Sequence, residues 1–228
     1  TDAITIEAWV KTPDTQGAIF GKELTITPWE GYGFSIGGNT ANGKLAFWYG
    51  NGANWDFSSS TVNDNIWHHV AVTFNSANSL FFIDGVLNAT VPKTGTVRLS
   101  SNATGFIGME TAGSRYFNGS IDEVKIYNFA LTEDEIREEY NQGSLLKLGS
   151  TGTDSSGNPD NSQNREYCVP GDTSTCNPPV ARWNFDEKTG TSANDISGNA
   201  NTGTLGGGVE ANRPSWVSGK VGGGLKFD

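Results

Sequence analysis

The chain has 228 residues, a formal charge of −10 and a pI of about 4.6. So acidic a protein repels a nucleic-acid backbone, and we expect no nucleic-acid partner. The sequence contains no apolar run long enough to cross a bilayer, which predicts that no segment inserts into a membrane. The length allows one large all-β domain or two small ones. The 12 Phe and 7 Trp are enough to fill a sandwich core, and the 30 Gly are typical of many turns.

Short strand patterns bounded by turn residues run through the first 127 positions. Residues 4–11 alternate inward and outward, and further strands are predicted at 33–37, 44–49, 67–74, 80–83, 105–109 and 120–127. The Asp84-Gly85 pair lies between two of these runs and predicts a type I′ hairpin turn. His68 and His69 are adjacent in a strand, so their side chains leave opposite faces and cannot bind one metal together.

One short helix is predicted near residues 132–142. Thr132 is a suitable N-cap, and Glu135 three residues later completes a capping box. Ile136 and Tyr140 then follow at helical spacing on one face. The acidic residues of the first turn complement the helix dipole, so we interpret them as structural rather than catalytic.

The composition divides the chain into three parts. Residues 1–142 form the main body, 143–179 are a polar linker rich in Gly, Ser, Asn, Asp and Pro, and 180–228 return to strand patterns at 181–185 and 224–227. Within the linker, Cys168 and Cys176 are close in sequence and have no histidine nearby. This spacing favours a local disulfide over a metal site and indicates an exported protein.

Several segments together resemble a known family, but in reversed order. ITIEAWVKT at residues 4–12, WHHVAVTFN at 67–75, FFIDGV at 81–86 and GSIDEVKIYNFALTEDEI at 119–136 are similar to the later strands of laminin-G-like jelly rolls of the concanavalin A-like lectin/glucanase superfamily. WNFDEKTGTSANDISGNANTGTL at 183–205 resembles the opening of such a domain. The resemblance implies an all-β fold, a two-sheet antiparallel β-sandwich (jelly roll) with one short helix.

The reversed order has two explanations. Either the domain is circularly permuted, or the chain is cut across tandem repeats. Residues 180–228 are therefore expected to supply opening strands that complete either the same domain or a neighbouring repeat.

The best candidate for a metal site is the Asp195–Asn201 segment, DISGNAN. Its alternating oxygen-bearing side chains around a glycine suit a hard cation. The family resemblance implies a structural Ca²⁺ held by Asp195, Asn199, Asn201 and Asp122. Alternation in strand 120–127 places Asp122 toward the core, where a carboxylate needs a partner. The alternative is an Asx-turn, with Asp122 bonded to backbone amides.

Four aromatic residues in turn-like segments are candidate ligand-binding residues: Trp29, Tyr32, Trp55 and Tyr116. Aromatic rings in loops stack on sugars, anchor protein interfaces or cover the rim of a sheet, and these alternatives remain open. The sequence has no nucleophile elbow and no alternating pair of carboxylates on one strand face, so we expect no enzymatic activity.

The sequence therefore predicts a non-catalytic recognition or adhesion module, extracellular or at the cell surface. Calcium would stabilise it, and a glycan or an extracellular-matrix component would be its ligand. The alternative is a structural repeat of a surface appendage or filament, assembled by strand exchange between copies of the chain.

Overall fold

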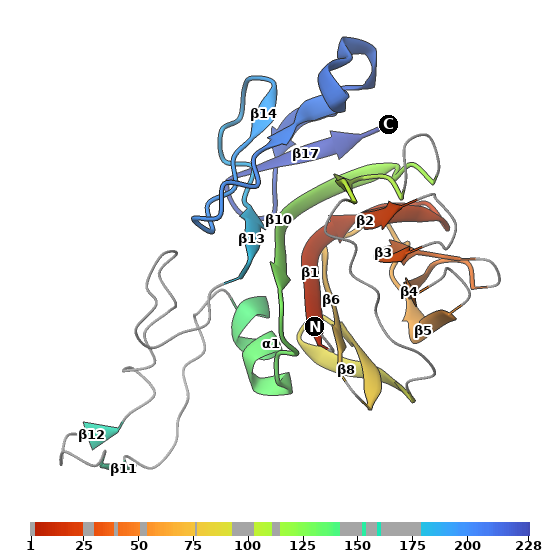
Figure 1. Cartoon of the computed structure of the whole chain (residues 1–228), viewed down its shortest axis with the longest axis vertical. Helices are drawn as coiled ribbons and strands as arrows, with labels where there is room; N and C mark the ends of the chain where they lie inside the picture. The colour runs from red at the N-terminus through yellow and green to blue at the C-terminus, as the bar shows by residue number, and fades with distance from the viewer. Residues whose placement is uncertain are drawn as a thin grey trace.

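The computed structural model describes residues 3–24, 30–38, 41–50, 54–75, 77–92, 103–110, 115–141, 152–153, 159–160 and 179–228. Among these residues, no helix is long and apolar enough to cross a membrane. Two antiparallel sheets pack face to face, as Figure 1 shows, and one α-helix lies beside them. This arrangement confirms the predicted β-sandwich, and the described part of the chain contains one short α-helix, as predicted.

The larger sheet has eight strands in the order β16-β17-β10-β1-β6-β7-β8, and β13 also pairs with β10. Their bounds are β1 (Ile4–Lys11), β6 (His68–Phe74), β7 (Asn78–Ile83), β8 (Val86–Pro92), β10 (Gly119–Tyr127), β13 (Ala181–Trp183), β16 (Ser215–Ser218) and β17 (Gly223–Phe227). The five-stranded sheet has the order β5-β4-β3-β2-β9. Its strands are β2 (Gly17–Leu24), β3 (Glu30–Ile36), β4 (Lys44–Gly50), β5 (Asn54–Thr61) and β9 (Gly105–Ile107).

The smaller elements lie outside these two sheets. They are α1 (Glu133–Tyr140), the pair β11 (Gly152–Thr153) and β12 (Pro159–Asp160), the pair β14 (Ser192–Ala193) and β15 (Gly203–Thr204), and the 3-10 turns η2 (Leu205–Gly208) and η3 (Glu210–Asn212).

The core lies between the sheets and follows the predicted alternation of β1. Ile4, Ile6, Ala8 and Val10 all point into it and are at most 4% exposed. They meet inward-facing residues of the five-stranded sheet, such as Phe47 of β4. The predicted hairpin turn is also present, because Asp84 and Gly85 have φ of 52° and 74° between β7 and β8.

Helix α1 begins as the sequence predicts. The Thr132 hydroxyl accepts a hydrogen bond from the Glu135 amide at 3.3 Å, and the Glu135 carboxylate accepts one from the Thr132 amide at 2.7 Å. Ile136 anchors the helix on the outer face of the larger sheet, where it joins a small apolar cluster that includes Ala71 and Phe82.

A β-bulge in β10 corrects the predicted orientation of Asp122. The pairing of β1 with β10 shifts between Glu7 and Trp9, and Glu123 takes a φ of 48°. Ile121 therefore faces the core on one side of the bulge, and Val124 faces it on the other. Simple alternation assigned the core face to Asp122, which instead lies buried on the opposite face.

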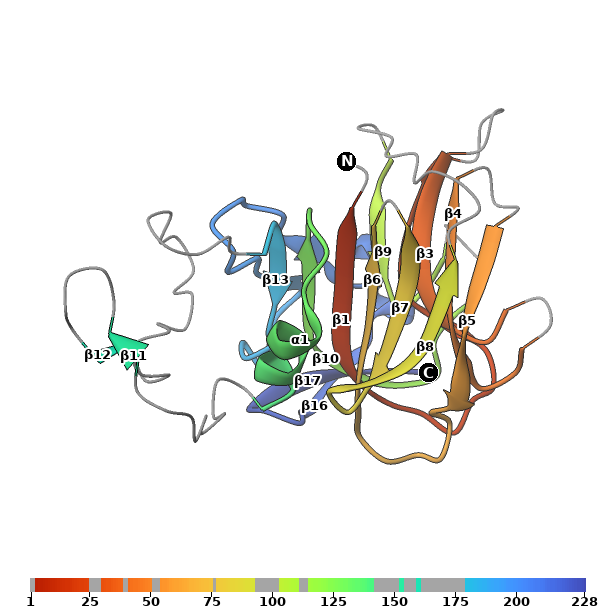
Figure 2. The ribbon, with the colours of Figure 1, turned by 90° about the horizontal axis from the view of Figure 1, so that it is seen from below.

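The C-terminal segment, residues 179–228, pairs with the body, residues 3–141, along β10. β17 pairs with Gly119–Ile121 and β13 with Val124–Ile126, so the two strands share the edge that β1 leaves open. Figures 1 and 2 show both strands beside β10. In this structure the opening strands thus complete the sandwich of their own chain.

Candidate functional site

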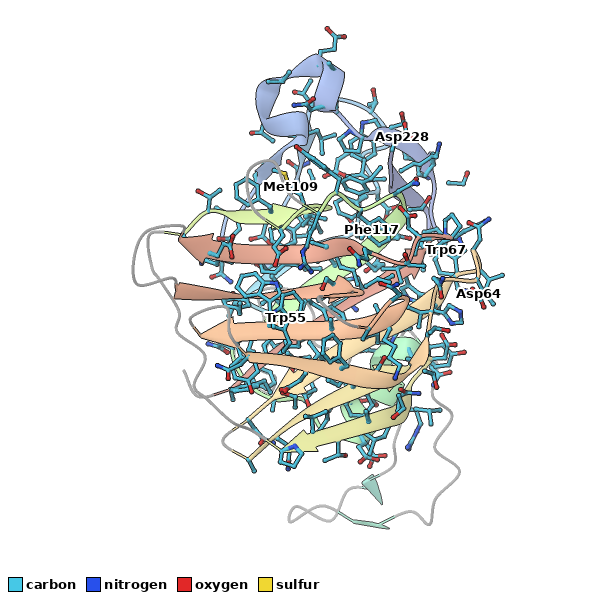
Figure 3. All side chains as sticks on the ribbon, turned by 90° about the vertical axis from the view of Figure 1, so that its right-hand side faces the viewer. Trp55, Asp64, Trp67, Met109, Phe117 and Asp228 are labelled. Carbon is cyan, nitrogen blue, oxygen red and sulfur yellow. The ribbon has the colours of Figure 1, made fainter. Side chains whose placement is uncertain are left out.

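The outer face of the five-stranded sheet carries a strip of aromatic side chains. Strand pairing aligns Gly33, Trp48 and Trp55 in one row across β3, β4 and β5. The centre of the Trp55 ring lies 6.4 Å from that of the Trp48 ring and 6.3 Å from that of the Phe57 ring. The planes of the Trp55 and Phe57 rings differ by 14°. In Figure 3, Trp55 lies on the sheet face that is turned toward the viewer.

Glycines allow these rings to lie flat against the sheet. A Cβ atom at Gly33 would approach the Trp48 indole to 2.3 Å, and one at Gly38 would come within about 3 Å of the Trp55 and Phe57 rings. Trp48 is 2% exposed, and its indole N–H has no hydrogen-bond partner among the described residues. Trp55 and Phe57 are half-buried, so one surface of the strip reaches solvent.

Charged groups flank the aromatic strip. The Arg115 guanidinium lies 4.8 Å from the centre of the Trp55 ring, and its Nε donates to the Glu110 carboxylate at 2.9 Å. Burial raises the pKa of Glu23 to about 7, with a further contribution from the negative charge of Glu110. Burial also raises the pKa of Glu110, against the effect of Arg115. At neutral pH this rim therefore offers both proton donors and acceptors.

This arrangement suits a ligand with an apolar face and hydroxyl groups. The half-buried rings provide a flat surface for stacking, and the adjacent carboxyl and guanidinium groups can hydrogen-bond to hydroxyls. Of the predicted ligand-binding residues, Trp55 lies on this face. Tyr116 follows Arg115 in the chain and is 60% exposed. Trp29 lies outside the described residues.

Tyr32 has a different position from the predicted one. It falls within β3 rather than in a turn, is 6% exposed and packs 5.9 Å from Phe20 in the core. Its ring is therefore part of the sandwich interior. Trp48 and Phe57, which do line the outer face, were missed. The sequence holds a signal for Phe57, because it alternates with Asp56 on the same strand face as Trp55.

The predicted metal loop gathers three of its four residues. Asp195 Oδ1 accepts from the amides of Arg182 and Ser197, and its Oδ2 accepts from the Asn201 amide at 2.8 Å. Burial tends to raise the pKa of Asp195, but these hydrogen bonds lower it below its usual value. The loop therefore holds an ionised carboxylate.

One carbonyl oxygen beside the loop, that of Val180, has several hydrogen-bond donors around it. The Val180 oxygen lies 3.1 Å from Nδ2 of both Asn199 and Asn201, and 3.3 Å from the Ser197 hydroxyl. A carbonyl has two lone pairs, and the oxygen and nitrogen of an asparagine amide exchange places when the amide turns over. With both amides turned, several oxygens would surround one point, as a hard cation requires. The loop thus fits calcium by the chemistry of its donors.

Asp122 does not belong to this loop. Its carboxylate accepts hydrogen bonds from the amides of Glu123 at 2.8 Å and Val221 at 3.0 Å, and neither partner lies in the 195–201 segment. The bulge at Glu123 explains this position. Among the described residues, no group of three or more His, Cys, Asp or Glu side chains could hold a metal ion. Cys168 and Cys176 lie outside the described residues.

A second polar cluster lies on the outer face of the larger sheet, beside α1. A cavity of about 120 Å³ is lined by Trp9, His69, Glu123, Lys125, Glu139, Arg182 and Val221. Lys125 forms an ion pair with Glu139 of α1, and its Nζ lies 3.3 Å from Glu7 Oε1. Arg182 of β13 pairs with Glu123 at 3.0 Å. These pairs attach the helix and the C-terminal segment to the sheet.

Comparison with known proteins agrees with this fold. A family model described as the concanavalin A-like lectin/glucanases superfamily matches residues 1–137. The chain belongs to this superfamily. A comparison with curated protein sequences gave no match.

Two solved structures illustrate how far the superfamily fold extends over the chain. A candidate carbohydrate-binding protein from Bacteroides ovatus is 17% identical with a TM-score of 0.59, over 89% of this chain and 52% of that protein. The chain thus spans about half the length of that protein. The SAP-like pentraxin from Limulus polyphemus is 16% identical with a TM-score of 0.50, over 61% of this chain and 70% of the pentraxin. At such identities, these likenesses concern the fold.

Proposed function

We propose that the chain is a non-catalytic carbohydrate-binding module of an extracellular or cell-surface protein. Its ligand, a glycan or an extracellular-matrix component, would lie on the outer face of the five-stranded sheet. The observation that carries this proposal is the aromatic strip of buried Trp48 and half-buried Trp55 and Phe57, with the Arg115–Glu110 pair beside it. The carbohydrate-binding description of the similar Bacteroides ovatus protein supports it.

The test is binding to a broad glycan array, followed by titration of the best ligand with Trp55→Ala. Loss of the stacking surface should weaken binding about tenfold or more, which corresponds to roughly 1.4 kcal/mol. Trp67→Ala is the matched control, because Trp67 is also partly buried but lies apart from Trp55 in Figure 3. Equal losses in both variants, or a blank array over a concentration series, would contradict the proposal.

We propose binding without catalysis because of the state of the two carboxyl groups on this face, Glu23 and Glu110. Burial and then the negative charge of Glu110 raise the pKa of Glu23, but Glu110 itself is held in an ion pair with Arg115. A glycoside hydrolase needs one carboxyl that donates a proton and a second that attacks or activates water. Reducing ends can be measured after long incubation with the bound glycan. If the unmodified chain releases reducing ends and Glu23→Gln does not, the chain is an enzyme and the non-catalytic proposal is wrong.

Calcium is proposed as a structural cofactor of the 195–201 loop. Asp195, Asn199 and Asn201 would hold the ion together with the Val180 carbonyl, and Asp122 would not take part. When bound, the ion would neutralise the carboxylate and rigidify the loop next to β13. The resemblance to laminin-G-like domains supports this role.

A further inference from the structure

The C-terminal segment joins the body through strand pairing that any copy of the chain could supply. Ala181 pairs with Ile126 in β13, and Leu225 pairs with Ile121 in β17. β16 extends the sheet only through β17. The pairing with the body therefore runs along β10, and its hydrogen bonds do not depend on which molecule contributes the segment.

The segment also fills part of the core. Trp183, Phe185 and Leu225 are 8%, 1% and 1% exposed, and all three belong to the cluster between the sheets. Burial of side chains this large contributes roughly 1.5–3 kcal/mol each. A body without the segment would expose this part of its core to water.

Polar contacts also cross the boundary between the segment and the body. Arg182 pairs with Glu123 at 3.0 Å, and the Val221 amide donates to the buried carboxylate of Asp122. Removal of the segment would leave Asp122 without this donor, and the edge of β10 would lose its partner strands. The body therefore requires a C-terminal segment, but a second molecule can provide an identical one.

The connection is long enough for such an exchange. Residues between Asn141 and Pro179 could span on the order of 100 Å when fully extended, at about 3.3 Å per residue. A long connection also lowers the effective concentration at which the segment meets its own body, which for short flexible linkers is in the millimolar range. Pairing between molecules can therefore compete with pairing within one molecule as the protein concentration rises.

We propose that residues 179–228 exchange between copies of this chain, so that the segment of one molecule completes the sandwich of another along β10. Reciprocal exchange produces a closed dimer. Exchange in one direction leaves an unfilled β10 edge at one end and a donor segment at the other, so it produces linear assemblies. The partner surface is the β10 edge between Gly119 and Ile126.

Cysteine pairs at a register position of this ladder can distinguish exchange from closure. Ser120 and Lys226 are partners in the β10–β17 pairing, where opposing Cα atoms lie within disulfide range. Both cysteines of the chain are first changed to serine. The single variants Ser120→Cys and Lys226→Cys are then mixed, unfolded in urea, refolded together and oxidised. Because each carries one cysteine, only exchange brings the two sulfur atoms together at this position.

We expect a disulfide-linked heterodimer on non-reducing gels, with a yield that rises with protein concentration during refolding. Ser120→Cys mixed with Glu210→Cys provides the background, because Glu210 lies in η3, outside the ladder. A double variant with Ser120→Cys and Lys226→Cys in one chain, refolded at high dilution, should form an internal disulfide. That product confirms the register.

Cross-linking of the mixture no greater than background at every concentration, together with closure of the double variant, would show that the segment pairs only with its own body. Failure of the double variant to close would refute the β10–β17 register and the proposal with it. Light scattering of the unmodified chain then distinguishes dimers from longer assemblies.

Discussion

The carboxyl group of Glu7 lies on the outer face of the larger sheet, 1% exposed. Its Oε1 is 3.3 Å from Lys125 Nζ, and its Oε2 is 3.8 Å from His69 Nε2. Burial raises the pKa of Glu7 to about 8, with repulsion from Glu139 adding to the effect and Lys125 opposing it. Burial likewise lowers the pKa of His69 to about 3. Both groups are therefore largely neutral at pH 6–7.

Glu7→Gln should make the chain less sensitive to alkaline pH. The folded-state pKa lies above the ordinary value of 4.5, so the stability linked to the protonated Glu7 is present below pH 4.5 and is lost as the pH rises toward 8. Glutamine keeps the shape and stays neutral, so at pH 9 the variant should be more stable by roughly 1 kcal/mol or more.

Urea unfolding at pH 5 and pH 9 measures this difference. Glu210→Gln, at an exposed position, serves as the control; it keeps Glu7 and should lose stability at pH 9 as the unmodified chain does. A variant that loses stability at pH 9 would show that an ionised Glu7 is needed as a partner for Lys125.

At the scale of single residues, local environment limited the site prediction. Trp55 could be identified from the sequence because it follows a turn. Trp48 could not, because a tryptophan inside a strand faces either the core or the outside, depending on register. Its outward position becomes clear only when Gly33 is found beneath its ring. The fold brings Arg115 over the Trp55 ring and Glu110 beside Arg115, although β9 and the residues after it are far from β5 in the chain.

Among the elements, helix α1 offers the simplest test. Its start depends on two reciprocal hydrogen bonds between Thr132 and Glu135, both of which are present. Thr132→Ala removes the cap acceptor and should reduce the free energy of unfolding by about 1 kcal/mol. Thr132→Ser keeps the hydroxyl and should retain most of the stability that the cap contributes. Chemical denaturation of the three proteins checks this order, and equal stabilities would contradict a stabilising role for the cap.

Strand β10 shows why some elements can be predicted and others cannot. The capping box involves neighbouring residues only, so the sequence alone was sufficient to find it. The bulge at Glu123 interrupts an otherwise regular alternation, and no glycine marks it. One extra residue reverses the facing of every side chain on one side of it. Asp122 was consequently assigned to the wrong face.

At the scale of the whole molecule, the family resemblance was the strongest signal. Matches spread over many strands together predicted the sandwich, although each is short. The reversed order of the two segments left open whether residues 180–228 complete their own domain or another. A single sequence cannot decide between them, because the strand pairing would be the same in both cases.

Calcium binding would stabilise the molecule as a whole, since the 195–201 loop contacts β13 through Asp195 and the Val180 carbonyl. A ligand that binds only the folded state raises the free energy of unfolding. We therefore expect EDTA to lower the Tm by several degrees, given about 2–4 °C per kcal/mol for a chain of this size. Thermal melts with excess calcium and with EDTA measure the shift.

Two variants locate the ion. Asp195→Asn should abolish the response to EDTA, because it removes the carboxylate of the loop while preserving its size. Asp122→Asn should retain the full response, because that carboxylate bonds to the amides of Glu123 and Val221 instead. If both variants lose the response, Asp122 also binds the ion. The C-terminal segment would then have to pair with β10 in a different register. If the unmodified chain melts at the same temperature with calcium and with EDTA, the loop is a hydrogen-bonded turn without an ion. The Val180 oxygen then only accepts hydrogen bonds from the loop.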